Sequence, residues 1–397
     1  MQRKLAIGID IGSDVTQVSY LIDGMTEPDT LEEMIPTTLK RTEDGTWDVS
    51  KEGIEQAAQF IVDCLTYIKE LTCLEEIDSL CITYKKPQKE FIRGVEEMLF
   101  LAGIQREKIY FESHEESAVH FALSQENTLW QREVIFFELS KEGFSYRSMR
   151  AQRAGRKTKI FMEEKDCSAI VNLSLLETEE GKKQADKDFL TLLGSLFGKR
   201  IINAVYLIGE GFFKENWAVA SLRYICNGRR AFKGLNLYTK GACYKAYDRI
   251  EKKVFPNFLL LCSGRLKVNI GVKILQKGTE YIIFLAKAGK RWYEETKEIE
   301  CIVDDAKEAE FVIAPAYEVP EWTEKISLQE LPYRENKMTR IRIELELLDE
   351  NTARIICMDL GFGKFVKESK IKITKEILLE KIEEVEEKEQ GGEGESR

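Results

Sequence analysis

The pattern of apolar and polar positions opens with two apolar runs that flank a short polar turn. Residues 4–11 and 15–21 are rich in aliphatic and β-branched side chains, and Gly12, Ser13 and Asp14 lie between them. This pattern predicts a strand hairpin. Its glycine-containing tip can leave backbone N–H groups free to hold a phosphate. A purely structural turn is the alternative, because many hairpins carry glycine and aspartate at the turn.

The following segments alternate between strand and helix periodicity. The predicted strands and helices up to the middle of the chain lie at residues 34–39, 50–72, 76–84, 88–102, 108–112 and 115–124. The long helix has apolar residues on one stripe, and Ser50 stands at its expected N-cap. Alternation of strands and helices predicts an α/β layer with a parallel portion.

A second round repeats the same plan. A hairpin over 133–149, a helix over 184–197, a strand over 201–208 and helices over 215–226 and from Thr239 follow one another. Such a repeat predicts an internal duplication around a central cleft. The return strand of the second hairpin is basic, which favours a solvated edge strand, with a nucleic-acid patch as the alternative. Its cations are Arg147, Arg150, Arg153, Arg156, Lys157 and Lys159.

Composition narrows the class of protein. The 397 residues are 43% hydrophobic and 32% charged, with a formal charge of −10, which argues against nucleic acid or a membrane surface as the main partner. No apolar run is long enough to span a membrane, and a strand begins too early for a signal peptide. The nine scattered cysteines and two histidines predict buried reduced thiols in a cytoplasmic protein, and no metal site.

Five landmarks in this order resemble the actin-like ATPase superfamily. Residues 8–13 resemble its first phosphate loop, 138–143 its second and 207–211 its adenosine loop, while Glu115 falls on its catalytic glutamate and 240–242 on its second connecting helix. The resemblance implies a duplicated ribonuclease H-like domain. It implies ATP or ADP with Mg²⁺ as the cofactor, and matches these residues to catalysis and nucleotide binding: Asp10, Glu115, Glu138, Gly12, Ser13, Asp14, Gly143, Gly209 and Gly211.

The second half is similar to the DnaK-type chaperone branch of that superfamily. Residues 258–261 resemble its hydrophobic interdomain linker, and a run of alternating strands resembles its peptide-binding β-sandwich. The resemblance implies a two-lobed domain over 1–253 (1–125 and 126–253), a linker over 254–263, a sandwich over 264–374, and a short helix from Glu376 and an acidic tail within 375–397. Four residues match the peptide groove, with sandwich core as the alternative: Val272, Leu275, Phe311 and Ile313.

The phosphate loops depart from the family pattern. The second loop carries Ser140, Lys141 and Glu142 where the family has glycines, and Glu210 adds an acid to the adenosine loop. The segment between Leu39 and Ser50 is too short to form the outer lobe that carries the family's catalytic lysine. A carboxylate close to a polyphosphate is unfavourable unless a metal intervenes. These changes favour a degenerate ATPase, and they imply no metal site.

We therefore expect a bacterial, chaperone-like protein with an inactive ATPase domain, which binds a polypeptide client or a protein partner through its β-sandwich. A co-chaperone or a full-length chaperone is the kind of partner that the resemblance implies. Two alternatives stay open: an ATP-dependent chaperone with unusual phosphate loops, and a non-catalytic actin-like scaffold.

Overall fold

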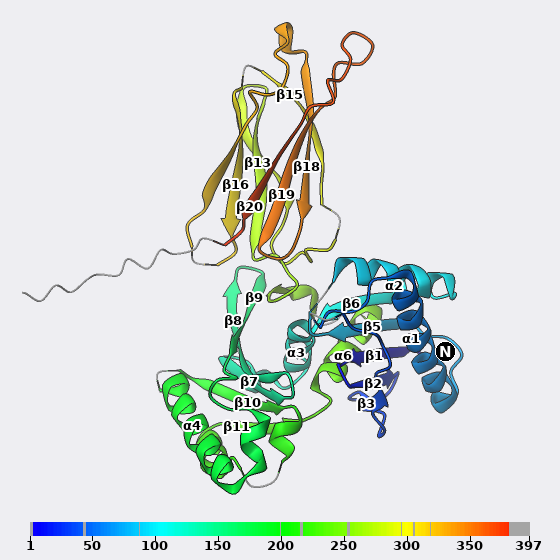
Figure 1. Ribbon diagram of the computed structural model, residues 1–397, viewed down its shortest axis with the longest axis vertical. Coiled ribbons are helices and arrows are strands. Elements are labelled where there is room, and N and C mark those ends of the chain that lie inside the picture. The colour runs from blue at the N-terminus through cyan, green and yellow to red at the C-terminus, as the bar shows by residue number, and fades with distance from the viewer. Residues whose placement is uncertain are drawn as a thin grey trace, which may run out of the picture. The chain divides into compact units, whose positions relative to one another are not determined.

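A computed structural model describes residues 3–380, except 43–44, 87, 199, 215–216, 252–254, 295, 305 and 318 (Figure 1). The chain forms two compact units. Unit 1 consists of Met1–Lys267 and Ala288–Tyr293, and unit 2 of Val268–Lys287 and Glu294–Arg397. The chain therefore leaves unit 1 after Lys267, returns to it for a short loop, and leaves it again after Tyr293.

The first lobe of unit 1 is built on one mixed sheet. Its strands are β1 (Leu5–Ile11), β2 (Val15–Ile22), β3 (Asp29–Thr30), β4 (Ile35–Pro36), β5 (Ser79–Tyr84) and β6 (Ile109–Ser113). The order is β3-β2-β1-β5-β6, in which β2 is antiparallel to β1 and β3, and the pairs β1–β5 and β5–β6 are parallel. Helices α1 (Lys51–Thr72) and α2 (Lys89–Leu101) pack their apolar stripes on one face of this sheet.

The second lobe repeats this arrangement. Its strands are β7 (Glu133–Ser140), β8 (Gly143–Ala154), β9 (Lys157–Asp166), β10 (Ile202–Ile208), β11 (Arg230–Gly234) and β12 (Phe258–Leu261). The order is β9-β8-β7-β10-β11, in which the first two neighbouring pairs are antiparallel and the last two are parallel, as in the first lobe. Strand β12 pairs in parallel with β9 at the edge of this sheet. Helices α4 (Glu179–Phe197) and α5 (Val219–Cys226) cover one face. The repeated order confirms the predicted α/β class and the predicted internal duplication.

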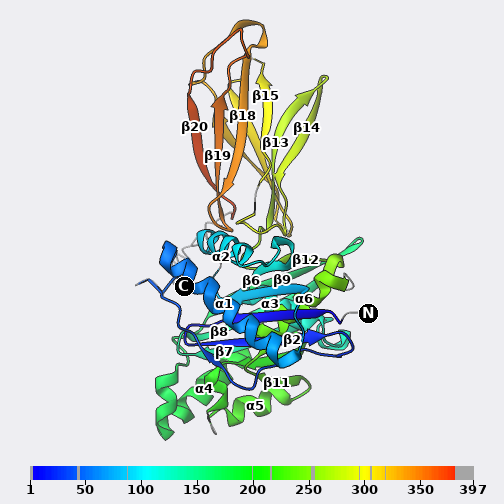
Figure 2. The ribbon, with the colours of Figure 1, turned by 90° about the vertical axis from the view of Figure 1, so that its right-hand side faces the viewer.

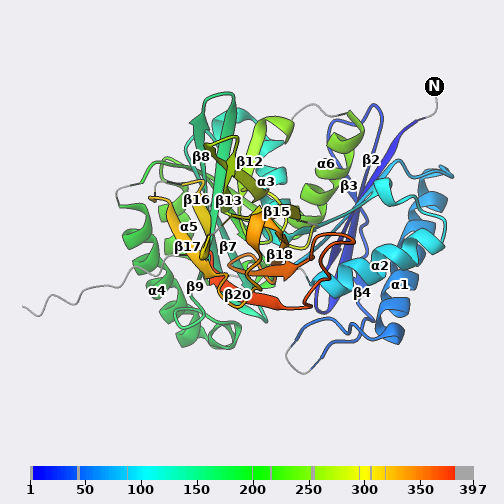
Figure 3. The ribbon, with the colours of Figure 1, turned by 90° about the horizontal axis from the view of Figure 1, so that it is seen from above.

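Two helices lie between the sheets and join the lobes (Figure 3). Helix α3 (His114–Leu123) packs on the second sheet, α6 (Leu237–Glu251) packs on the first, and the two helices contact each other. Glycines permit the close approach. A Cβ atom on Gly8 of β1 would lie 2.3 Å from the Thr239 carbonyl oxygen, and one on Gly241 would lie 2.0 Å from that of Ser117. Neither position has space for a side chain.

Unit 2 consists of two four-stranded antiparallel sheets that face each other (Figure 2). One sheet has the order β14-β13-β16-β17 and the other β15-β18-β19-β20. Alternate residues of β18 are buried, as expected for a strand with one face in a sandwich core. The strands are β13 (Val268–Gln276), β14 (Thr279–Ala286), β15 (Ile299–Val303), β16 (Glu308–Pro315), β17 (Trp322–Ser327), β18 (Thr339–Leu347), β19 (Thr352–Asp359) and β20 (Lys372–Leu378).

Short 3₁₀ helices complete the described secondary structure, at Arg106–Lys108, Asn127–Leu129, Leu173–Glu177, Glu210–Phe213, Phe255–Asn257 and Glu335–Lys337. None of the helices in the described part of the chain combines the length and hydropathy that a membrane-spanning helix needs. All nine cysteines are free thiols, and six of them are buried.

Three features differ from the sequence prediction. The apolar segment 258–261 is not a linker but strand β12, because pairing with β9 buries Leu260 and Leu261. The segment predicted as a helix from Glu376 begins inside strand β20, where its alternating residues pair with β19, and residues 381–397 lie outside the described part. The basic strand β8 is not an edge strand, since it pairs with both β7 and β9.

Candidate functional site

The candidate site is a pocket of about 400 Å³ in unit 1, at the ends of strands from both lobes. The turn after β1 contributes Gly12, Ser13 and Asp14, and Gly209 follows β10. Gly209 has a φ of 87°, so the backbone there has the left-handed conformation that favours glycine. The two other predicted loop glycines, Gly143 and Gly211, are not among the lining residues.

Asp10, near the end of β1, is bonded to a histidine of the protein. The ring Nε2 of His114 lies 2.7 Å from Asp10 Oδ1, and both side chains are almost buried. His114 is the first residue of α3, which Ser113 and Glu116 start with reciprocal N-cap hydrogen bonds. The imidazole also stacks on the ring of Tyr238 from α6, with centroids 4.1 Å apart.

Glu138, near the end of β7, also accepts hydrogen bonds from side chains of the protein. Arg147 Nη1 donates to Glu138 Oε2 over 2.6 Å, and the Tyr238 hydroxyl donates to the same oxygen over 2.7 Å. Burial by itself raises the pKa of Glu138, but Arg147 and His114 together with these hydrogen bonds lower it to about 2. Arg147 is 1% exposed and also pairs with Glu164. Asp10 and Glu138, which the resemblance matches to catalysis, therefore both bind residues of the protein itself.

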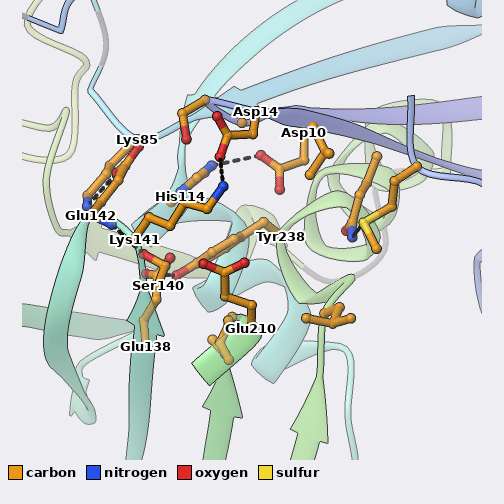
Figure 4. Close-up of a pocket in the computed structure, with 18 of the residues that line it drawn as sticks. Asp10, Asp14, Lys85, His114, Glu138, Ser140, Lys141, Glu142, Glu210 and Tyr238 are labelled. Carbon is orange, nitrogen blue, oxygen red and sulfur yellow. Dashed lines mark hydrogen bonds and ion pairs between the residues drawn. The ribbon is translucent and has the colours of Figure 1, made fainter. Parts of the chain in front are cut away.

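The two turns that match phosphate loops are bridged by side chains (Figure 4). Lys141 Nζ donates to Asp14 Oδ2 over 2.9 Å and so connects the turn after β7 with the turn after β1. Glu142 in the same turn accepts a hydrogen bond of 2.9 Å from Lys85 and lies 3.7 Å from Arg41. The Lys141–Asp14 pair is exposed, so its contribution to stability is small. It links the two turns, and both of its side chains line the pocket.

The ionised side chains that line the pocket are Asp10, Asp14, Glu138, Glu142, Glu210, Arg41, Lys85 and Lys141. Five negative charges stand against three positive ones, which gives a net charge of −2. A triphosphate would bring further negative charge into this pocket, and like charges repel strongly where water is partly excluded. No group of three or more His, Cys, Asp or Glu side chains in the described residues could hold a metal ion.

Glu115, which falls on the family's catalytic glutamate, does not line the pocket. Its Oε2 accepts a hydrogen bond of 2.6 Å from the backbone N–H of Ser263, and burial raises its pKa to about 7. The next residue, Glu116, is fully buried and accepts hydrogen bonds from Arg265 over 2.7 Å and from Arg291 over 3.1 Å. Burial opposes its ionisation, but Arg291 and Arg265 lower the pKa of Glu116 to about 2.

Several of these residues were not predicted from the sequence. His114, Tyr238 and Lys85 match none of the motifs. The basic strand was predicted to be a solvated edge. This prediction is wrong for Arg147, which is buried, whereas Arg150 is exposed as expected. The signal that could have identified Arg147 is the alternation of β8, which puts it on the same face as the buried Met149.

The four residues matched to a peptide groove lie in unit 2. Val272, Phe311 and Ile313 are buried in the sandwich, with exposed fractions of 1%, 0% and 0%. This burial favours the core interpretation for these three. Leu275 near the end of β13 is 77% exposed and available at the surface.

Comparison with solved structures finds kinases and an activator protein. A ROK hexokinase from Thermus thermophilus has a TM-score of 0.40 at 13% identity, over 63% of this chain and all 100% of that chain. A ROK family glucokinase from Streptomyces griseus, in complex with glucose and AMPPNP, has 0.37 at 11%, over 62% and 99%. The activator of the 2-hydroxyisocaproyl-CoA dehydratase from Clostridium difficile, with bound ADPNP, has 0.34 at 11%, over 62% and 96%. At this level the likeness says nothing about the ligand or activity of this chain.

No curated protein matches the sequence. The profile of a domain of unknown function (DUF8552) matches residues 265–379, which agrees with the extent of the β-sandwich. A second profile, described as "Family of unknown function (DUF5716) C-terminal", matches residues 31–263, more than half of the chain. The chain belongs to this DUF5716 C-terminal family.

Proposed function

We propose that this chain is a chaperone-like binding protein that does not hydrolyse ATP. In this proposal unit 1 keeps an actin-like architecture without its chemistry, and unit 2 binds an extended polypeptide or a protein partner. A co-chaperone or a full-length chaperone is the kind of protein partner that we propose. One observation carries the proposal for unit 1: Asp10 and Glu138 are each bonded to a basic or hydroxyl side chain of the protein itself.

Phosphoryl transfer from a nucleotide would depend on two conditions, and the contacts in this pocket oppose both. The first is that carboxylates are free to hold the waters of a metal that bridges the phosphates. If a hydrated cation took the place of Arg147 beside Glu138, the carboxylate would lose a charge-assisted hydrogen bond of 2.6 Å. A buried carboxylate loses several kcal/mol, of the order of 3–5, when its partner is removed.

The second condition is space for phosphate beside backbone N–H groups. In nucleotide-binding loops of this kind, glycine allows the backbone to approach the phosphate oxygens. Here the side chains of Lys141 and Glu142 occupy the turn after β7, and the carboxylate of Asp14 occupies the turn after β1. A nucleotide would have to break the ion pairs of Lys141 and Glu142 before its phosphates could reach the backbone.

The proposal for unit 2 is supported by its architecture. A sandwich of two open sheets has strand edges, and strand edges are places where an extended chain can add backbone hydrogen bonds. Unit 2 follows an actin-like unit, in the order that the resemblance to DnaK-type chaperones implies. The function of unit 2 is therefore proposed as recognition of an extended segment.

Fluorescence anisotropy of the full chain tests this proposal. The probe is a fluorescein-labelled octapeptide in which valine and threonine alternate between terminal lysines. We expect saturable binding, and a dissociation rate that millimolar MgATP leaves unchanged. Absence of saturable binding would overturn the function proposed for unit 2. Faster release with MgATP would overturn the function proposed for unit 1.

A second candidate is an ATP-driven chaperone with unusual loops. The observation that favours it is the pocket itself, since about 400 Å³ is within the range of small-molecule sites and Lys85 and Lys141 line it. The two candidates predict opposite results in the MgATP experiment. If the nucleotide binds without being hydrolysed, release of the peptide is unchanged or slower, and calorimetry detects the heat of nucleotide binding.

A further inference from the structure

The inference concerns strand β14, one of the four edge strands of unit 2 (Figure 2). It rests on the function proposed for this unit. We propose that β14 is the surface on which the polypeptide adds as a further strand, and that the added segment is extended and has uncharged side chains where it pairs with Tyr281–Phe284.

The edges of the sandwich differ in how they are protected. Natural sheets protect exposed edges with charges, short strands or contacts that cover the edge. Edge strand β15 carries Glu300, and β17 and β20 carry several charges. Those last two strands also contact each other, because Lys375 Nζ of β20 donates to Glu324 and to the Lys325 carbonyl oxygen, each over 2.9 Å.

Strand β14 has no such protection along most of its length. After Glu280 it consists of six uncharged residues, Tyr281 to Ala286. Tyr281, Ile282 and Phe284 are 49%, 40% and 37% exposed. A β-rich, uncharged and exposed edge is normally an aggregation hazard, so its presence needs a reason. Recognition of another strand is such a reason.

The apolar surface of β14 is also preorganised. A Cβ atom on Gly271 of the neighbouring strand would lie 2.5 Å from Ile282 Cγ2 and 3.2 Å from Phe284 Cδ1. These two side chains therefore pack directly over the glycine and cover its backbone. Side chains that are already fixed lose little conformational entropy when a ligand binds.

The backbone on the free side of β14 identifies the occupant as a strand. Within the described residues, β14 pairs with β13 alone, so alternate backbone groups point away from the sheet. At one end the pairing is already continued, since the Lys297 N–H donates to the Leu285 carbonyl oxygen over 3.2 Å. From Glu280 to Phe284 another extended segment can take the same position. Such strand addition obtains affinity from main-chain hydrogen bonds.

Two kinds of change test this inference with the labelled octapeptide and the full chain. The variant Ile282→Lys places a charge on the edge, and we expect it to weaken peptide binding at least tenfold. The matched control is Ile302→Lys on β15, where the side chain is 50% exposed, and we expect less than a twofold change. Circular dichroism and thermal unfolding verify that both variants fold.

The second change is made in the peptide. Two versions carry N-methyl groups on alternate residues, one version on the odd positions and one on the even positions. Strand addition predicts that only one of them loses binding, again at least tenfold, because only alternate N–H groups face β14. A contact through side chains alone predicts the same affinity for both versions, and this result would overturn strand addition.

The outcomes separate the inference from the proposed function. Peptide binding that neither Ile282→Lys nor N-methylation weakens overturns the assignment to β14 and leaves polypeptide binding intact. Absence of peptide binding overturns the proposed function, and the inference falls with it. Sedimentation equilibrium that shows a dimer in the wild type but not in Ile282→Lys, without peptide binding, would assign the edge to a second copy and overturn the choice of occupant.

Discussion

Removal of Arg147 is the perturbation that tests the internal pairing of the pocket most severely. The variant Arg147→Met keeps a long apolar side chain and deletes the charge. Among the described residues, it leaves Glu138, whose side chain is 14% exposed, with the Tyr238 hydroxyl as its side-chain donor. The other partner of Arg147, Glu164, is 37% exposed and can be hydrated instead.

The expected loss of stability follows from the pKa of Glu138. Its environment lowers this pKa from 4.5 to about 2, and one pKa unit corresponds to about 1.4 kcal/mol. The ionised carboxylate is therefore stabilised by roughly 3 kcal/mol at neutral pH. In the wild type this contribution is present above pH 4.5 and is lost as the pH falls towards 2. Removing one partner of a buried pair costs about 3–5 kcal/mol, so both arguments give the same magnitude.

In Arg147→Met the dependence on pH has the opposite sign. Burial without the arginine raises the pKa of Glu138, so that protonation removes the unpaired charge. The difference in the free energy of unfolding between the variant and the wild type therefore becomes smaller as the pH falls from 8 to 5. The double variant Arg147→Met/Glu138→Gln removes both charges. We expect it to recover at least about 2 kcal/mol relative to Arg147→Met, since a neutral pair leaves no buried charge.

Urea unfolding followed by tryptophan fluorescence measures these differences. Four of the five tryptophans belong to unit 1, and Trp322 belongs to unit 2. The background variant Trp322→Phe therefore makes the fluorescence report on unit 1 alone. A cost below about 1 kcal/mol for Arg147→Met, or a double variant no more stable than the single one, would refute the role assigned to this pair.

Two further predictions use the same background and assay. Gly8→Ala should destabilise unit 1 by more than about 2 kcal/mol, because its Cβ atom would meet the Thr239 carbonyl oxygen. Gly194→Ala in α4 should stabilise unit 1 by about 0.5–1 kcal/mol, because its Cβ atom would have no neighbour within 4 Å and alanine favours the helix. Equal effects of the two would contradict the packing described for α6. Glu115→Gln should stabilise unit 1 at pH 8 by about 1–3 kcal/mol. The pKa of Glu115 is raised to about 7, so the folded wild type loses stability as the pH rises through that value. Glutamine carries no charge and still accepts the hydrogen bond from the Ser263 N–H. A variant less stable than the wild type at pH 8 would contradict this assignment.

Much of unit 1 could be predicted from the sequence because its signals are local. The helix capped by Ser50 and the hairpin turn at Gly12 each follow from a pattern within one element. The duplication also follows from the order of elements. Strand β12 could not be predicted as such, because its pairing partner β9 lies about a hundred residues earlier in the sequence, and an apolar segment of four residues fits a linker equally well.

The chemistry of the pocket was predictable only in part. The acidic and bulky residues in the phosphate loops are visible in the sequence and suggest that the loops have changed. Their partners are not, since His114, Arg147 and Tyr238 come from three different elements and meet only in the fold. The sequence therefore predicts that nucleotide chemistry is impaired, and the structure adds that Asp10 and Glu138 already have partners within the protein.

We propose that the contacts of Asp10 and Glu138 within the protein keep a nucleotide and its metal from binding in the pocket. Isothermal titration calorimetry of the purified full chain with MgATP tests it most directly, with MgADP and adenosine as parallel titrations. We expect no saturable heat with MgATP at millimolar concentration. Saturable binding of MgATP in the micromolar range, weakened by removal of Mg²⁺, would contradict it.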